Sequence, residues 1–136
     1  MGATLNVRKA GTEFAAPDEI PVRPFDLTPS RNMAPAEGRI EPVVRYRVHA
    51  HRTIEQITYV LSGEVEVISF DAETGAAGSV RLAPGEAVVT LPGESLEFRC
   101  AGDAAARVLF VTAPPYPADN SDTVVLGIHR ELGPGD

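Results

Sequence analysis

Cysteine, tryptophan and basic residues are scarce in this chain of 136 residues. Cys100 is the single cysteine, so no intrachain disulfide can form and nothing requires an oxidising compartment. Twelve lysine and arginine residues stand against nineteen aspartate and glutamate residues, which gives a formal net charge of −7. This deficit argues against a nucleic-acid partner, because phosphate binding needs an excess of basic side chains.

Long apolar runs are also missing. No stretch approaches the roughly 18 apolar residues of a membrane span, and the first 30 residues hold no continuous apolar segment of a secretory signal. We therefore expect a cytoplasmic protein with no membrane partner. Apolar residues still make up 43% of the chain and charged residues 23%, which is typical of a single globular domain.

Proline and glycine divide the chain into three parts. Six prolines interrupt residues 1–42 so often that no useful helix fits, and we expect a Pro-rich extended N-terminal arm. Residues 43–128 contain short apolar or alternating runs separated by turn signals, and residues 129–136 are expected to form a flexible tail. The runs are 43–51, 56–61, 64–70, 79–82, 86–91, 95–99, 107–112 and 123–128. About eight short strands at this spacing predict an all-β sandwich or barrel.

Two histidines one residue apart are the most distinctive chemical feature. Side chains at i and i+2 of a strand point to the same face, so His49 and His51 can form half of a metal site. Alternation alone allows a second interpretation, in which the pair is the polar face of an edge strand.

The order of residues around this pair resembles a known family. His49, His51, Gln56 and Gly63 follow one another as in the first motif of the cupin superfamily, and residues 84–93, from Pro84 to Gly93, resemble the opening of the second motif. The resemblance covers roughly residues 40–113. It implies a cupin-type jelly-roll β-barrel (double-stranded β-helix), usually a homodimer, with a small-molecule site inside the barrel.

The departures from the motifs concern the metal ligands. The resemblance places the third ligand, often Glu, on Gln56, whereas Glu55 has the opposite strand parity. It places the fourth ligand, a histidine, on Leu96, and a later asparagine on Cys100. An amide oxygen gives a cation less charge than a carboxylate, and leucine cannot bind a metal.

The resemblance therefore implies a weakened, open metal site made of His49, His51 and Gln56. A divalent metal is the implied cofactor, and the sequence does not distinguish Zn, Mn, Fe or Ni. Glu55 would supply a carboxylate if it turned inward. His129 would complete the site from the C-terminal segment, although a surface position is the alternative for it.

Strand parity adds candidate substrate-binding residues. If the histidines face the lumen, so do Arg47, Arg45 and Val43, and two guanidinium groups would favour an anionic or carbonyl-bearing ligand. In the alternative interpretation, both arginines pair with glutamates on the rim. Phe98 is placed on the cavity wall by the same alternation, with plain core packing as its alternative.

Two functions remain open from the sequence. The first is a small-molecule cupin enzyme that catalyses an isomerase, cyclase, epimerase or lyase-type step on a polar, anionic metabolite, with His49 or His51 as metal ligand or as acid–base group. The second is a non-catalytic ligand-binding cupin with a degenerate metal site, which Leu96 and Gln56 favour. A structural role in a larger complex is a third, weaker alternative.

Overall fold

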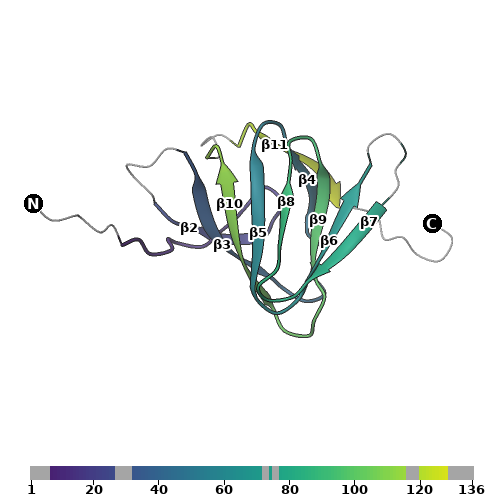
Figure 1. Cartoon of the computed structure of the whole chain (residues 1–136), viewed down its shortest axis with the longest axis horizontal. Helices are drawn as coiled ribbons and strands as arrows, with labels where there is room; N and C mark the ends of the chain where they lie inside the picture. Colours follow the sequence, from purple (N-terminus) through teal and green to yellow (C-terminus); the bar gives the residue numbers. More distant parts are fainter. Residues whose placement is uncertain (1–6, 27–31, 72–73, 75–76, 116–119, 129–136) are drawn as a thin grey trace, which may run out of the picture.

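The computed structural model describes residues 7–26, 32–71, 74, 77–115 and 120–128, and it contains eleven strands. No helix occurs among these residues, so the described part of the chain offers none that could cross a bilayer. The strands form two antiparallel sheets that face each other and enclose the core (Figure 1). The expected all-β class is confirmed.

Successive strands belong to different sheets along most of the chain. One sheet has the order β1 (Phe14–Ala15), β2 (Pro21–Pro24), β3 (Ala34–Ile40), β10 (Ala106–Ala113), β5 (Glu55–Ser62) and β8 (Ala87–Thr90). The other has the order β11 (Thr123–Ile128), β4 (Arg47–His51), β9 (Ser95–Cys100), β6 (Val65–Phe70) and β7 (Ala77–Leu82). From β3 onward the chain crosses between sheets at every step except β6 to β7, which is the jelly-roll path that the resemblance implied.

Alternation along the strands builds the core. On β5 the inward residues Gln56, Thr58 and Val60 are buried while their neighbours are exposed. Val60 joins a cluster of apolar side chains from both sheets that includes Val65 and Phe98, each at most 1% exposed. Burying an apolar side chain of this size contributes about 1.5–3 kcal/mol, so this cluster holds the sheets together.

The turn from β5 to β6 depends on a glycine. Gly63 has a φ of +78°, and a Cβ at this position would lie 2.9 Å from Cα of Ala106. Both the backbone conformation and the close approach of β10 therefore favour glycine here.

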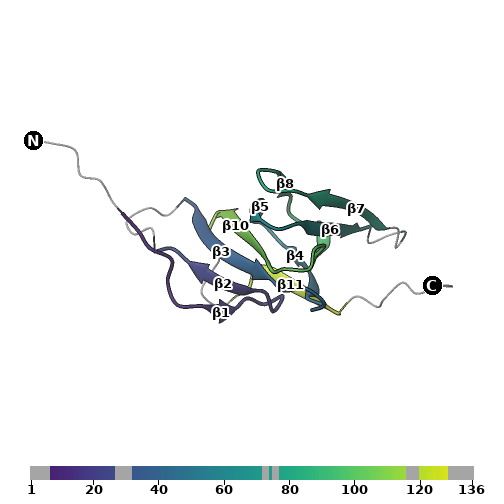
Figure 2. The ribbon, with the colours of Figure 1, turned by 90° about the horizontal axis from the view of Figure 1, so that it is seen from below.

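The N-terminal region is more ordered than the sequence indicated. Strand β3, within the stretch expected to be an arm, pairs with β10 from Ala34 opposite Thr112 to Ile40 opposite Ala106. Strands β1 and β2 extend the same sheet beyond β3 (Figure 2). Proline excludes helix, but its fixed φ lies within the extended region, so the prolines of β2 and β3 are compatible with strands. The sheet thus begins well before Val43, while the expected tail at 129–136 lies outside the described residues.

Candidate functional site

A cavity of about 140 Å³ lies between the N-terminal strands and the inner face of the barrel. Its apolar wall includes Phe14 and Phe110 together with prolines and alanines of β2 and β3. Its polar lining comes from segments far apart in the sequence, namely Asp18, His49, His51, Gln56, Asn120 and Thr123. A mostly apolar cavity with a few convergent polar groups is the usual form of a small-molecule site.

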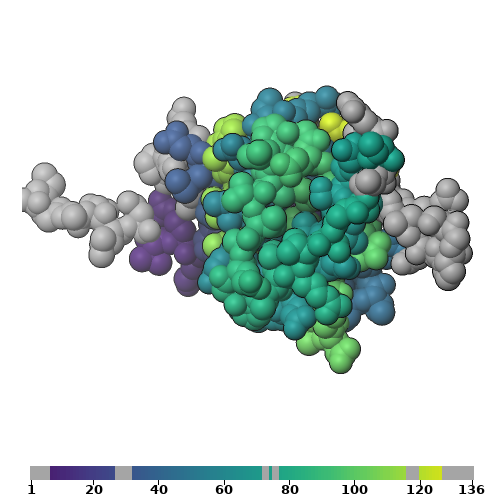
Figure 3. All heavy atoms as spheres, turned by 45° about the vertical axis from the view of Figure 1, so that its right-hand side comes forward, coloured from purple at the N-terminus to yellow at the C-terminus, as the bar shows by residue number. Residues whose placement is uncertain are grey.

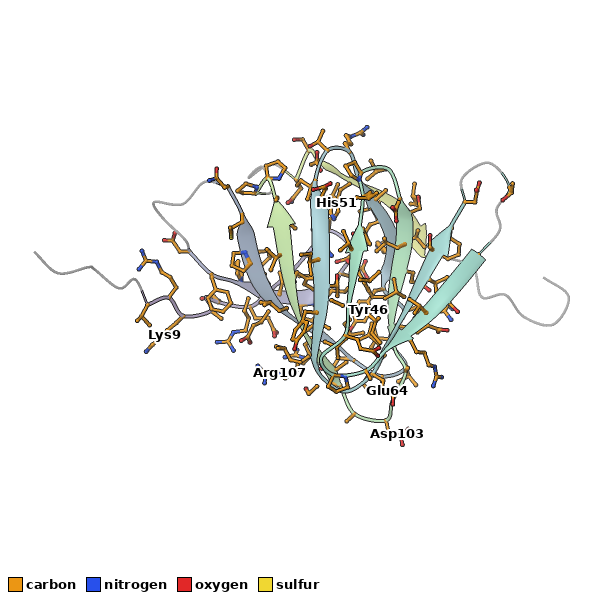
Figure 4. All side chains as sticks on the ribbon, in the orientation of Figure 1. Lys9, Tyr46, His51, Glu64, Asp103 and Arg107 are labelled. Carbon is orange, nitrogen blue, oxygen red and sulfur yellow. The ribbon has the colours of Figure 1, made fainter. Side chains whose placement is uncertain are left out.

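Strand β4 supplies both imidazoles. His49 and His51 are at most 6% exposed, and their ring centroids lie 5.2 Å apart with an interplanar angle of 67°. Figure 4 shows His51 toward one end of the barrel and Tyr46 nearer the other. The pair therefore lines the cavity from one strand, with both rings on the same side of the sheet.

His51 belongs to a chain of polar contacts. Its Nε2 lies 3.3 Å from Oε1 of Gln56, and the Gln56 amide donates to Oγ1 of Thr58 at 3.1 Å. On the other side of the ring, Nδ1 lies 3.2 Å from Oγ1 of Thr123 on β11. These contacts hold the imidazole in one orientation and connect both sheets at the site.

His49 is more isolated. Its Nδ1 lies 3.4 Å from Oδ2 of Asp18 but makes no hydrogen bond to any described residue. The ring packs against Phe98, with centroids 5.8 Å apart. A buried polar atom without a hydrogen bond costs free energy, and such atoms concentrate where a ligand or a reaction uses them.

Burial sets the charge of the site. Burial lowers the pKa of His49 to about 4, and burial together with the neighbouring His49 lowers the pKa of His51. Burial also raises the pKa of Asp18 to about 6, although a hydrogen bond from the amide of Ile20 opposes the shift. Near neutral pH the two imidazoles are consequently neutral, and Asp18 carries the negative charge of the cavity.

Asp18 and Thr123 had no signal in the sequence. Asp18 lies in the turn between β1 and β2, within the region expected to be an arm, and Thr123 begins the last described strand. Neither belongs to a motif or to a periodic pattern. Their proximity to the histidines follows from the pairing of β11 with β4 and from the β1–β2 segment lying beside the barrel.

The two candidate arginines lie outside the cavity lining. Arg45 Nη2 is 3.5 Å from Oε1 of Glu97, a fully buried carboxylate on β9. Arg47 Nε is 2.5 Å from Oε1 of Glu19 and is partly exposed. The alternation of side chains that placed Arg45 and Val43 in the lumen does not apply before Arg47, because β4 begins there. Val43 has a φ of +59° and is fully exposed.

Phe98 also lies behind the cavity rather than on its surface. Its side chain is 1% exposed, belongs to the apolar cluster and contacts the rings of His49 and Phe110. It supports His49 from the core side.

Two of the three expected metal ligands, His51 and Gln56, lie within the distance that donors of one ion would have. Bonds of about 2.0–2.1 Å place neighbouring donor atoms of one ion roughly 3.0–3.4 Å apart, and Nε2 of His51 and Oε1 of Gln56 are 3.3 Å apart. His49 lies on the same face. Leu96, directly opposite His49 on β9, is buried and supplies no ligand. Within the described ranges, no group of three or more His, Cys, Asp or Glu side chains is arranged to hold an ion.

Comparison with solved structures supports the jelly-roll fold. Oxalate decarboxylase from Bacillus subtilis matches with a TM-score of 0.74 and 19% identity, over 93% of this chain and 33% of that one. The capsular polysaccharide assembling protein CapF from Staphylococcus aureus matches with a TM-score of 0.72 and 16% identity, over 86% of this chain and 34% of that one. The chain spans about a third of the length of these two proteins.

A protein of similar length also matches. An uncharacterized conserved protein with a double-stranded β-helix domain from Klebsiella pneumoniae has a TM-score of 0.62 and 16% identity, over 85% of this chain and 89% of that one. At such identities the likeness concerns the fold alone. No curated protein sequence matches the chain.

A family model settles the relationship that the two motifs indicated. The model described as the cupin domain matches residues 34–112, which is more than half of the chain. The matched segment runs from the start of β3 to Thr112 in β10 and contains both histidines and Gln56. The chain therefore belongs to the cupin family.

Proposed function

We propose that this cupin is a small-molecule enzyme whose reaction takes place at His49 and His51, in the cavity beside Asp18. The observation that carries the proposal is the pair of buried, neutral imidazoles on one wall of a cavity whose lining is mostly apolar. A neutral imidazole accepts a proton, and a carboxyl group whose pKa is raised to about 6 exchanges one near neutral pH. Such a set suits an isomerisation, cyclisation, epimerisation or lyase-type step.

Each polar residue has a defined role in this proposal. His51 is oriented by Thr123 and Gln56, so that its ring keeps one position when a substrate proton is transferred. His49 faces Asp18 and lacks a hydrogen bond at Nδ1, which leaves that atom ready for a new partner. The apolar wall excludes water and strengthens the electrostatic interactions within the cavity.

A divalent metal at His49, His51 and Gln56 is an extension of this proposal. A bound ion of Zn, Mn, Fe or Ni would polarise a substrate oxygen. The distance between Nε2 of His51 and Oε1 of Gln56 supports the extension, and so does the presence of Mn(II) centres in the oxalate decarboxylase of Bacillus subtilis, which shares the fold.

Metal titration of the purified chain tests this extension. We expect weak binding of Mn²⁺ or Zn²⁺ by isothermal titration calorimetry, lost in His51→Ala. In Gln56→Glu a carboxylate replaces the amide, and binding should tighten by about tenfold or more. If Gln56→Glu leaves the affinity unchanged, the metal extension fails and acid–base chemistry remains.

Acid–base catalysis has its own test. Proton exchange between solvent deuterium and the acidic C–H positions of a panel of small carbonyl compounds, followed by NMR, detects it without knowledge of the substrate. We expect exchange in the wild type and its loss in both His49→Gln and His51→Gln, while Glu19→Gln, outside the cavity, keeps it. Exchange that survives both histidine substitutions would remove the enzyme proposal.

A specific observation favours the second candidate, a non-catalytic ligand-binding cupin. Leu96 occupies the position opposite His49 and is 3% exposed, so an apolar side chain fills the place next to the site. In this case the cavity binds a small molecule without turnover. Ligand binding together with an absence of proton exchange would support this function over the first.

We also propose that the chain forms a homodimer through the outer face of β5 and β8. This face exposes apolar side chains, with Ile57 directly opposite Val89, and it includes Tyr59, Leu61 and Leu91. Residues of the β7 to β8 region, teal to green, cover the near face of the molecule in Figure 3. Contiguous exposed apolar surface of this kind marks association sites.

Light scattering during size-exclusion chromatography tests the dimer. Val89→Lys should shift a dimer to a monomer, because it places a charge in the centre of this face. Val80→Lys is the matched control, since Val80 is equally an exposed valine but lies on β7 of the other sheet. A wild type that elutes as a monomer at all concentrations would remove the proposal.

A further inference from the structure

The turn between β1 and β2 holds the carboxylate of Asp18 in the cavity through several backbone contacts. The backbone carbonyl of Asp18 accepts from the amide of Arg47 at 3.0 Å, which ties the turn to β4. Glu19 adopts a φ of +76°, a conformation that costs free energy for a residue other than glycine. Within the turn, Oδ1 of Asp18 accepts from the amide of Ile20 at 3.2 Å. The second oxygen, Oδ2, is left facing His49 and the cavity.

Among the described residues, no lysine or arginine balances the carboxylate of Asp18. Asp18 is only 7% exposed. Arg47 reaches Asp18 only through its backbone amide, and its guanidinium group is paired with Glu19. None of the described residues that line the cavity is a lysine or an arginine. A buried carboxylate without a cation is costly, and a ligand that supplies the positive charge removes that cost.

The rest of the lining is suited to a carbon skeleton. Phe14 and Phe110 are aromatic, and the remaining apolar contacts come from prolines, alanines and Val22. A cavity of about this size holds a single six-membered ring. Aromatic faces also attract organic cations.

We propose that the cavity selects a small organic cation, an amine on a compact apolar body, whose ammonium group pairs with Asp18. This inference rests on the proposed function, because it assumes that a small molecule occupies the cavity. It reverses the preference for an anion that Arg45 and Arg47 suggested in the sequence, since neither arginine lines the cavity.

Three compounds of nearly equal size and different charge test the selection. Benzylamine, benzyl alcohol and benzoate are titrated at about pH 8, where the amine is a cation and the acid an anion. Binding is followed by NMR through the methyl groups of Ala16, Ala34 and Ala36, which line the cavity and report where the compound binds. We expect benzylamine to bind about tenfold or more tightly than benzyl alcohol, and benzoate about tenfold or more weakly.

Two variants assign the preference to one carboxylate. Asp18→Asn keeps an oxygen that can accept from the amide of Ile20 and removes the charge, so the amine should lose its advantage over the alcohol. Glu19→Gln is the matched control, because it removes the neighbouring carboxylate, which is half exposed and paired with Arg47 outside the cavity. This control should keep the order of the three compounds.

The outcomes separate this inference from the proposed function. Equal binding of the three compounds, or tighter binding of benzoate, overturns the cation selection and leaves a small-molecule cavity in place. Failure of all three to shift the alanine methyls argues against both. The order of affinities in the wild type decides the inference even if Asp18→Asn fails to fold.

Discussion

The interior of the barrel has two halves that differ in chemistry. Around Phe98 the side chains of Val60, Val65 and Val108 are apolar and fully buried, and they pack against one another. At the end bounded by the N-terminal strands, equally buried positions hold carboxylate, imidazole and amide groups around a cavity. The apolar half stabilises the fold, whereas the polar half carries a buried carboxylate with no lysine or arginine beside it among the described residues, and an imidazole nitrogen without a hydrogen bond. This difference supports the proposal that a small molecule binds in the polar half.

The largest expected effect is in the apolar half. Phe98→Ala removes a fully buried aromatic ring and should lower the free energy of unfolding by about 3–5 kcal/mol. Phe14→Ala is the matched control, because Phe14 is 54% exposed on β1 and should cost less than about 1 kcal/mol. Urea unfolding measures both. Equal losses for the two phenylalanines would show that the contrast between the halves is wrong.

The free energy of unfolding should depend on pH through shifted groups of the polar half, among them Asp18 and His49. The pKa of Asp18 is about 6 in the folded protein against 3.8, so its contribution is lost as the pH rises from about 4 to 6. The pKa of His49 is about 4 against 6.5, so its contribution is lost as the pH falls through the same window. Each shift corresponds to at most about 3.5 kcal/mol, and in the wild type the two trends oppose each other.

Single substitutions separate these opposing trends. In Asp18→Asn the free energy of unfolding should rise with pH between about 4 and 6.5, because the lowered pKa values of His49 and His51 then act without the opposing carboxyl group. In His49→Gln the rise should be smaller or reversed over the same window, because Asp18 then opposes His51 alone. Urea unfolding at a series of pH values, with a chelator present, gives both slopes. The same slope in both variants would contradict the assignment.

Restoring the missing fourth ligand should raise the metal affinity of the polar half. Leu96→His places an imidazole opposite His49, at the position of the fourth ligand in the cupin motif. Affinity for Mn²⁺ should rise about tenfold or more, which corresponds to about 1.4 kcal/mol. Leu96→Met, which keeps an apolar side chain of similar volume, should leave the affinity where it is. Calorimetric titration distinguishes the two results.

The smallest effect is expected outside both halves. Arg47→Ala breaks an ion pair with Glu19 between two partly exposed side chains, and exposed pairs contribute at most about 1 kcal/mol. Because Arg47 does not line the cavity, affinity for benzylamine should change less than about threefold. A large loss of benzylamine affinity in this variant would show that Arg47 does contribute to the binding site.

Local patterns predicted much of the fold. The alternation on β5 and β10, and the Gly63 turn between β5 and β6, were legible because strand parity and turn conformation depend on neighbouring residues. Strand β3 was not expected, because prolines ruled out helix without indicating that an extended segment would find β10, far along the chain, as its partner. Parity also failed before Arg47, because β4 begins there and Val43, with its positive φ, lies in the connection from β3.

The sequence by itself determined the all-β class, the cupin resemblance and the shared face of His49 and His51, because each follows from spacing along a strand or from a motif. Tertiary structure alone decided that Asp18 and Thr123 meet these histidines, that Arg45 and Arg47 pair with glutamates away from the cavity, and that Leu96 is buried opposite His49. The reason is physical: pairing between distant strands sets these contacts, and the burial that accompanies it sets the charge of each group.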